Sequence, residues 1–434
     1  MKIGRKERNR VPLADGFVKV FASPDPKRLY TYSPGIAVSP SGRLIATMDM
    51  SGPGMEEIPG PKALAEGGRL WQGKVFTSDD KGRTWVHRVD FPYMHARPFY
   101  AGKVLYVLGQ ADNLMIIRSD DDGETWSEPV RLTDDERLST ISPGRVTKWH
   151  QAPANVHYNN GHIYLVFEKR IYTDIPGWNV HGIAPILMRG AIDSDLTQRH
   201  NWTFASELAF RDAVNVDALD YFGVPFFSTT GTAKPELSCP ALGWLETNVV
   251  QFRDPDHYWY DPAGKTYHLW ARAHTGGTGY AAIAKVVEQS DGSMTTMLET
   301  TPSGQKILFV PCPGGQMKFH ILYDEVDKLF WLLSSQATDS MTRRDRLPPE
   351  RFGLPNNERH RLQLHFSKNC IDWCFAGLVD MGGSPKEARH YASMAIDGDN
   401  LYILSRSGDE NAKNAHDGDM ITFHVVEDFR SLVY

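Results

Sequence analysis

The side chains of this chain that could transfer protons or hold an anion stand at the ends of short apolar runs. Those with carboxyl, phenol or guanidinium groups are Asp49, Glu246, Arg272, Arg359, Arg361 and Tyr391. A carboxyl group near a leaving oxygen can donate a proton to it, and an arginine fork can bind a carboxylate with two hydrogen bonds. If the fold brings them together, these residues predict a site for an acidic sugar. Taken singly, each also fits a surface ion pair or a strand-end cap.

Two histidines widen the range of proton-transfer chemistry. His150 lies in the segment Trp149–Pro153, and His416 is followed by Asp417. The ordinary pKa of histidine lies near neutrality, so His150 could act as an acid or a base, whereas His416 is a candidate substrate-binding residue. Both also fit structural positions, His150 at the start of a strand and His416 in a turn before the last strand.

Two turns of nearly the same sequence indicate how the chain is organised. Ser78–Trp85 and Ser119–Trp126 share the pattern Ser-x-Asp-x-Gly-x-Thr-Trp, and an apolar run precedes each. Short acidic side chains accept hydrogen bonds from the N–H groups of a turn, and glycine adopts a positive φ at little cost. The final Trp can bury a large ring against a sheet. Each copy is therefore predicted to be a hairpin turn between two strands.

Short apolar or alternating runs bounded by Gly, Pro, Asp or Asn recur along the chain, which predicts an all-β fold. They group into five sets of four strands and a last set of three, with a period of about 40–65 residues. The run Phe17–Ala22 can supply the missing strand of the last set. We therefore predict a six-bladed β-propeller closed by an N-terminal strand, since closure removes exposed sheet edges. Seven blades, with extra strands in 212–242, and a β-sandwich are the alternatives.

The predicted organisation is an N-terminal extension over residues 1–16 and one propeller domain over residues 17–434. Inserts rich in Gly, Pro or Met interrupt the repeats at 50–72, 212–242 and 338–358. Loops on a rigid scaffold commonly carry function. We therefore expect these inserts to gather at one end of the propeller and to shape a pocket there.

The composition excludes several classes of function. The net charge is −6 without a long run of like charge, which argues against a nucleic-acid partner. No apolar stretch of about 18 residues predicts a membrane span, and residues 1–16 lack the apolar segment of a signal peptide. The protein is thus expected in the cytoplasm, or exported with its signal removed. Four cysteines make no disulfide framework, and neither metal-ligand spacing nor a nucleotide-binding motif points to a metal or a cofactor.

The paired turns resemble the Asp boxes of the sialidase-like β-propellers, and the resemblance extends over about residues 33–429. Segments similar to those that carry the catalytic residues of that family are Gly42–Asp49, Glu246–Val250 and His390–Ser393. The resemblance implies Asp49 as acid/base, Tyr391 as nucleophile and Glu246 as the group that accepts the tyrosine proton. The implied function is an exo-acting glycoside hydrolase that cleaves a terminal acidic sugar from a glycan.

The same resemblance implies a carboxylate-binding group of arginines. Arg272 and Arg361 would bind the substrate, with Arg359 and His390 beside them. Sialidases carry a further arginine before the first blade, and the matching region Tyr30–Ile36 has none. Because this arginine is missing, the resemblance predicts an acidic sugar as substrate without specifying sialic acid.

A second resemblance leads to different chemistry. Trp149–Pro153, Pro313–Gly315 and the His416 segment look like parts of sialidase-like propellers that act on rhamnose–glucuronate polysaccharides, as hydrolases or as lyases. It implies that His150 transfers the proton, with Tyr391 and Arg272 beside it. A third alternative is a propeller that binds a glycan without converting it.

All of these readings depend on one geometric condition. Asp49 and Tyr391 belong to the first and last predicted blades, so ring closure alone can bring them together. We expect Asp49, Glu246, Arg272, Arg361 and Tyr391 to point into one cavity at the axis, with Tyr391 and Glu246 within hydrogen-bond reach.

Overall fold

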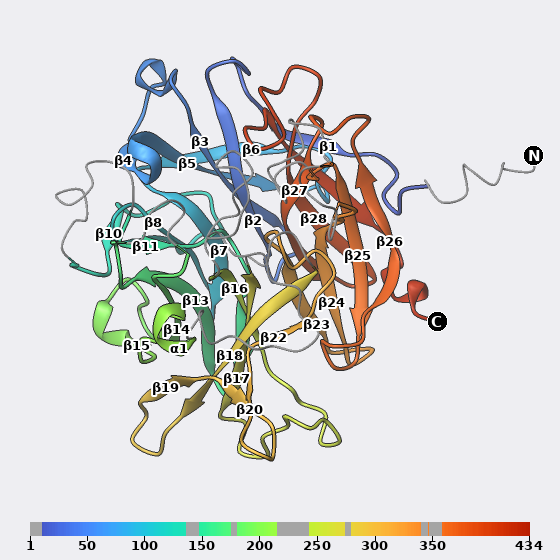
Figure 1. Cartoon of the computed structure of the whole chain (residues 1–434). Coiled ribbons are helices and arrows are strands. Elements are labelled where there is room, and N and C mark those ends of the chain that lie inside the picture. The colour runs from blue at the N-terminus through green and yellow to red at the C-terminus, as the bar shows by residue number, and fades with distance from the viewer. Residues whose placement is uncertain are drawn as a thin grey trace, which may run out of the picture.

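Antiparallel strands make up nearly all the regular structure of the computed structural model of this protein, which describes residues 11–135, 147–174, 180–214, 243–273, 279–339, 346 and 358–434. The strands form six blades around a central axis (Figure 1). This arrangement confirms the predicted six-bladed, all-β propeller. The sequence folds in this way because its apolar runs are short, and Gly, Pro and Asp turns end each of them.

The blades are described here in chain order, and in each the first strand lies innermost. Blade one contains β2 (Tyr30–Val38), β3 (Leu44–Ser51), β4 (Ala63–Ala65), β5 (Arg69–Ser78) and β6 (Val86–Phe91). Blade two contains β7 (Met94–Ala101), β8 (Val104–Gln110), β9 (Leu114–Ser119) and β10 (Val130–Arg131). Blade three contains β11 (Trp149–His150), β12 (His157–Asn159), β13 (His162–Arg170), β14 (Ile183–Ala191) and β15 (Trp202–Phe204).

The second half of the chain repeats this order. Blade four contains β16 (Trp244–Val250), β17 (Thr266–Ala273), β18 (Tyr280–Glu288), β19 (Met294–Met297) and β22 (Phe309–Pro311), with the pair β20 (Glu299–Thr300) and β21 (Lys306–Ile307) nearby. Blade five contains β23 (His320–Asp324), β24 (Leu329–Ser335), β25 (Arg361–Ser367) and β26 (Cys374–Met381). Blade six contains β27 (Arg389–Asp397), β28 (Asn400–Ser407), β29 (Met420–Val426) and β1 (Val18–Ala22).

The pairing of β1 with β29 closes the ring. Val18 lies opposite Phe423 and Ala22 lies opposite Met420 in an antiparallel register. The outermost strand of the last blade therefore comes from the start of the chain, as the sequence predicts. Upstream of β1, the N–H groups of Leu13 and Ala14 donate to the carbonyl oxygens of Leu378 and Val379, both on β26. Part of the predicted 1–16 extension thus packs on blade five.

Helical structure is short wherever the chain is described. The α-helix α1 (Phe210–Ala213) is joined by the 3-10 turns η2 (Met55–Glu57), η3 (Glu66–Gly68), η5 (Arg199–Asn201) and η10 (Phe429–Leu432). Within the described ranges, no helix has the length and apolar character needed to cross a lipid bilayer. Most of the predicted inserts 212–242 and 338–358 lies outside the described residues.

The two repeated turns have the same hydrogen-bond pattern. Asp80 Oδ1 accepts the N–H of Thr84 at 2.9 Å, and Asp121 Oδ1 accepts the N–H of Thr125 at 2.8 Å. In each turn a glycine with φ of 84° or 88° makes the reversal. The terminal Trp donates its indole N–H to that glycine's carbonyl at 3.1 Å in both copies. The acidic side chain and the glycine therefore perform the structural roles that the pattern predicts.

Irregular steps in the first strands re-aim side chains toward the axis. The register shifts between Tyr32 and Gly35, between Met94 and Arg97, between Leu245 and Asn248, and between His390 and Ser393. Within these steps lie four non-glycine residues with positive φ: Ser33 at 26°, His95 at 53°, Glu246 at 57° and Tyr391 at 51°. A bulge commonly turns a side chain out of the regular sheet face, and bulges recur next to functional sites. Two of the predicted catalytic residues therefore occupy equivalent positions in different blades.

Removing β1 should weaken the fold by opening blade six. Deletion of residues 1–22 exposes the edge of β29 and the apolar side chains that cover it. We expect a loss on the order of 2–4 kcal/mol in the free energy of unfolding, measured by chemical denaturation. A deletion that ends before Val11 is the control and should change stability much less. Equal stability of the two deletion variants would contradict the role of β1 in closure.

The Asp121 carboxylate should stabilise the second turn only where it is ionised. Hydrogen bonds from the hydroxyl and N–H of Thr125 lower the pKa of Asp121 from 3.8 to about 2. The stabilisation is therefore present above pH about 4 and is lost as the pH falls toward 2. Asp121→Asn should cost about 1 kcal/mol or less above pH 4, because the site is exposed, and nothing near pH 2. Urea denaturation from pH 2 to 6 measures this, with Asp120→Asn as control. If the difference in free energy of unfolding between the wild type and Asp121→Asn stayed constant from pH 2 to 6, this role of the carboxylate would be contradicted.

Candidate active site

Tyr391, Arg272 and Glu246 form one hydrogen-bonded group near the axis. Arg272 Nη1 donates to the Tyr391 hydroxyl oxygen at 2.8 Å and to Glu246 Oε2 at 3.1 Å. Arg272 Nε donates to the carbonyl oxygen of Gln316 at 2.9 Å, which orients the guanidinium plane. Burial and the Glu246 charge raise the pKa of Tyr391 above its ordinary value. The phenol is therefore protonated at neutral pH, and Arg272 joins it to the Glu246 carboxylate.

Two further guanidinium groups flank the Tyr391 ring. The Cζ atoms of Arg359 and Arg406 lie 5.6 and 5.1 Å from the centroid of the ring. Arg359 Nη1 donates to His390 Nδ1 at 3.0 Å, so the ring nitrogen accepts. Burial lowers the pKa of Arg359 to about 9, which leaves it charged at neutral pH. With Arg272, the arginines place three positive charges around one phenol.

Arg361 makes different contacts from its neighbour Arg359. Its Nη2 donates to Glu358 Oε1 at 2.7 Å and to Thr338 Oγ1 at 3.2 Å. Its guanidinium is thus committed to a carboxylate of the protein. The sequence analysis named Arg361 as a substrate-binding arginine with Arg359 beside it. In the structure it is Arg359 that lies against the Tyr391 ring.

Asp49 joins the same end of the propeller through His95. Asp49 Oδ1 accepts the N–H of His95 at 2.7 Å, and Oδ2 lies 3.7 Å from His95 Nε2. Complete burial raises the pKa of Asp49 well above its ordinary value, although the His95 N–H and the Arg406 charge act in the opposite direction. The Arg406 charge also influences Tyr391. Closure of the ring therefore links the carboxyl of blade one electrostatically to the phenol of blade six.

Five second-strand residues occupy equivalent positions around the axis. Each lies opposite a first-strand residue of its own blade in the antiparallel register. The second-strand residues and their partners are Asp49 with Tyr32, Gln110 with Met94, Glu168 with His150, Arg272 with Leu245 and Arg406 with His390. Sequence reasoning identified Asp49 and Arg272 but missed Glu168 and Arg406. The available signal was a charged residue near the end of a buried second strand, the context shared by all four.

Glu168 is a second buried carboxyl group near Glu246. Glu168 Oε1 accepts the N–H of Thr247 at 2.9 Å and the side-chain amide of Gln151 at 3.3 Å. Burial raises the pKa of Glu168 to about 8, and the Glu246 charge adds to the rise. Glu168 therefore holds a proton at neutral pH, whereas Glu246 faces a guanidinium. Two neighbouring carboxyl groups in unlike environments can serve different steps of acid–base chemistry.

His150 lies beside this group. It is 3% exposed, and its ring centroid is 5.6 Å from that of His95. Burial, followed by the charges of Arg170 and Arg272, lowers the pKa of His150 well below its ordinary value. The imidazole is neutral at neutral pH and is chemically able to accept a proton. No group of three or more His, Cys, Asp and Glu side chains suited to a metal ion occurs in the part of the chain that the structure describes.

An aromatic and acidic wall continues the site. The Tyr32 ring lies 4.8 Å from the Trp71 ring, at the end of the first insert, and 4.2 Å from the Cζ of Arg406. The Tyr32 hydroxyl donates to Asp417 Oδ1 at 2.9 Å, and His416 Nδ1 lies 2.8 Å from the same oxygen. His416 thus packs at the edge of the group, where its carbonyl also accepts from Arg406.

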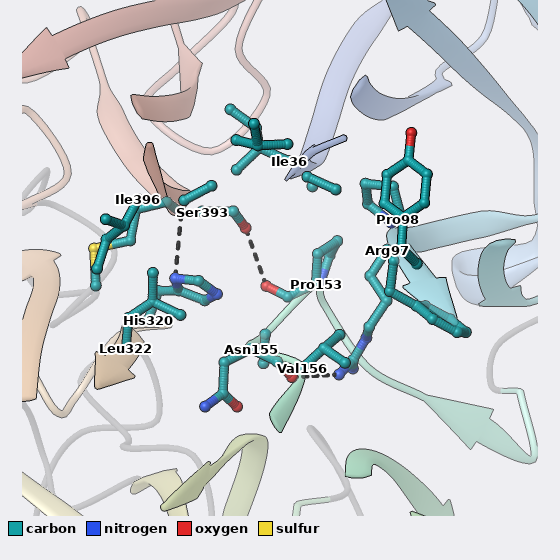
Figure 2. A pocket seen from close by; sticks show the side chains of 18 of the residues that line it. Ile36, Arg97, Pro98, Pro153, Asn155, Val156, His320, Leu322, Ser393 and Ile396 are labelled. Carbon is teal, nitrogen blue, oxygen red and sulfur yellow. Dashed lines mark hydrogen bonds between the residues drawn. The ribbon is translucent and has the colours of Figure 1, made fainter. Parts of the chain in front are cut away.

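The axial cavity in the structure lies beyond these residues. It has a volume of about 430 Å³ and is lined from five blades, as Figure 2 shows. Four of its lining segments are Gly35–Val38, Arg97–Tyr100, Pro153–Val156 and Ser393–Ile396. They follow the bulges along the first strands, so the cavity occupies the other half of the axis. The residues predicted to share one axial cavity do not line this one.

Comparisons with known proteins identify the fold. No family model matches the chain. No curated protein matches it either. A protein of unknown function from Dyadobacter fermentans is similar in structure, with a TM-score of 0.52, 12% identity and coverage of 95% of this chain and 99% of that one. A Trypanosoma rangeli sialidase, in complex with sialic acid, has a TM-score of 0.51, 14% identity and coverage of 97% and 60%. The Penicillium chrysogenum α-L-arabinanase, in complex with arabinobiose, has a TM-score of 0.50, 11% identity and coverage of 97% and 100%.

The raised pKa of Glu168 predicts a loss of stability with rising pH. The unfolded carboxyl releases its proton near pH 4.5, whereas the folded one keeps it to about pH 8. The folded state is therefore favoured below pH 4.5 and loses this advantage as the pH rises to 8. Glu168→Gln should flatten this decline, which amounts to at most on the order of 5 kcal/mol. Chemical denaturation at intervals from pH 4 to 9 measures the effect.

The matched control is Glu325→Gln, at an exposed glutamate of the β23–β24 turn. This variant should keep the pH dependence of the wild type. A decline that persists unchanged in Glu168→Gln would show that another group causes it.

Proposed function

We propose that the protein is an exo-acting glycoside hydrolase that removes a terminal acidic sugar from a glycan. The observation that carries the proposal is the hydrogen bonding of Arg272 to both Tyr391 and Glu246, with two further arginines against the tyrosine ring. An anionic sugar needs cations for its carboxylate and repels a carboxylate nucleophile, so a phenol is the suitable nucleophile. The sialidase and the arabinanase named above use this fold for sugar ligands, which is compatible with the proposal.

In the first step Tyr391 attacks the anomeric carbon and the bond to the leaving oxygen breaks. Glu246 takes the phenol proton as the new carbon–oxygen bond forms. Arg272 holds the phenol oxygen and the Glu246 carboxylate in place through one nitrogen, and so fixes the direction of proton transfer. Asp49, whose pKa is raised by burial, donates a proton to the leaving oxygen.

In the second step water attacks the glycosyl–tyrosine bond. Asp49 has lost its proton in the first step and now takes one from the water, while Glu246 returns a proton to the phenol. The sugar leaves with net retention, since two displacements occur at the same carbon.

The substrate carboxylate is assigned to Arg272, Arg359 and Arg406. Arg406 comes from β28 of the last blade and supplies a third guanidinium near Tyr391. It thereby compensates for the arginine that is missing from Tyr30–Ile36. Buried guanidinium groups bind a carboxylate strongly because water does not screen them.

A lyase is the second candidate, and the neutral state of His150 favours it. In that reaction a base removes the proton next to a uronate carboxyl group, and the product contains a carbon–carbon double bond. This product absorbs in the near ultraviolet, whereas a hydrolysis product does not. Cleavage with an absorbance rise, lost in His150→Ala and retained in Asp49→Asn, would replace the hydrolase by the lyase.

Tyr391→Phe tests the proposal directly. The variant keeps the ring and its contacts with Arg359 and Arg406, but it removes the nucleophilic oxygen and with it the hydrogen bond from Arg272. Turnover of a fluorogenic sialoside or of a uronate-capped oligosaccharide should fall by at least about 10³-fold, while the carboxylate sugar still binds. Product formation is followed by fluorescence and by mass spectrometry.

Tyr258→Phe, at a tyrosine that is 71% exposed, is the matched control and should keep full activity. Full activity in Tyr391→Phe would exclude the phenol as nucleophile. Binding on a glycan array without any product after long incubation of the wild type would instead identify a binding propeller.

A further inference from the structure

A buried lysine lies directly beneath the bulge that carries Tyr391. Lys318 is 1% exposed and stands two residues before β23, in the blade next to Tyr391. Its Nζ donates to the carbonyl oxygen of Ala392, the residue that follows Tyr391, and to Ser393 Oγ at 3.2 Å. The ammonium group therefore holds the backbone at the register step between His390 and Ser393.

Ser393 extends this contact across the axis. Its hydroxyl lies 2.8 Å from the carbonyl oxygen of Pro34 and 3.3 Å from that of Pro153. Figure 2 shows the contact with Pro153. Pro34 and Pro153 belong to blades one and three. Lys318 and Ser393 thus bind four blades to one another between the Tyr391 group and the axial cavity.

The charges that face Lys318 come from three elements. The Glu246 carboxylate on β16 favours its charged form, whereas burial and the Arg97 guanidinium on β7 act in the opposite direction. His320 on β23, whose own pKa is lowered well below its ordinary value, remains neutral beside it. Burial is the largest effect and lowers the pKa of Lys318 to about 7. The ammonium is therefore charged throughout the acidic range, in which carboxylates titrate.

We propose that Lys318 is a positioning residue for the proposed reaction: it fixes the Tyr391 bulge through Ala392 and Ser393 and supplies a positive charge to Glu246. This inference rests on the proposed function. Lys318 acts through Tyr391 and Glu246 rather than on the substrate. The motifs that predict the repeated turns and the arginine group do not predict a lysine at position 318.

Lys318→Met tests both parts of the proposal. Methionine keeps the apolar stem but removes the donors and the charge. We expect kcat to fall by about 10–100-fold with KM changed less than about threefold, because nucleophile alignment is lost while the carboxylate contacts remain. The acid limb of the pH profile should move to higher pH by about half a unit or more, since the acidic groups of the site lose a nearby buried cation. Lys318→Arg should keep the wild-type acid limb.

The matched control is Lys74→Met, at another buried lysine, which pairs with Asp90 in blade one. It should leave the acid limb and kcat unchanged. A uniform loss of activity in Lys318→Met with an unshifted acid limb would overturn the proposal, because a merely structural lysine behaves in that way.

A crystal structure of Lys318→Met separates this inference from the proposed function. We expect the distance from the Tyr391 hydroxyl to Arg272 Nη1, which is 2.8 Å in the wild type, to increase by about 0.5 Å or more. An unchanged distance overturns the inference even if the wild type is inactive on every glycan. If Lys318→Met does not fold, Ser393→Ala removes one acceptor of Nζ and keeps the charge. That variant should lower kcat by about 3–10-fold without moving the acid limb, and an unchanged kcat overturns the proposal.

Discussion

The bulges in the first strands are the constraint on which the candidate site depends. A regular strand sends alternate side chains to the two faces of its blade, where neighbouring blades cover them. At the bulge the φ angles of Glu246 and Tyr391 are 57° and 51°, and their side chains meet at Arg272 instead. A positive φ at a residue other than glycine costs about 1–3 kcal/mol of conformational free energy. It persists where the surrounding structure holds the backbone in place. The closed ring, whose second strands are buried along nearly their whole length, supplies that support.

Burial then sets the charge of each group according to its nearest partner. Glu246 has a guanidinium 3.1 Å away, whereas Glu168 accepts neutral amide groups and keeps its proton to about pH 8. Asp49 likewise accepts a backbone N–H, and burial raises the pKa of its carboxyl well above the ordinary value. The three carboxyl groups therefore lie in unlike electrostatic environments. This difference comes from the contacts of the three carboxyl groups, since their intrinsic acidities are nearly equal.

The fold could be predicted because several local signals agree. The two Asp-Gly turns, the period of the apolar runs and the surplus strand Phe17–Ala22 all require the same closed ring, and the structure confirms it. The site could be predicted only in part. Arg406 and Glu168 match Asp49 and Arg272 through the cross-strand register, and that register depends on bulges that leave no sequence signature. The choice between Arg359 and Arg361 depends on how the chain enters β25, where Glu358 captures one of the two arginines.

Buried hydrogen bonds separate the Tyr391 group from the axial cavity. All described first strands run away from the Tyr391 group, and the cavity lies among the residues that come later on them. Between the two, the Ser393 hydroxyl bonds backbone oxygens of blades one and three, and Lys318 bonds blade six. These bonds join blades one, three, five and six between the Tyr391 group and the cavity. Under the proposed function, a substrate would reach Tyr391 from the opposite end, where Asp49, Arg272 and Arg406 stand near the ends of their strands. Such a site would suit the end of a glycan better than its middle.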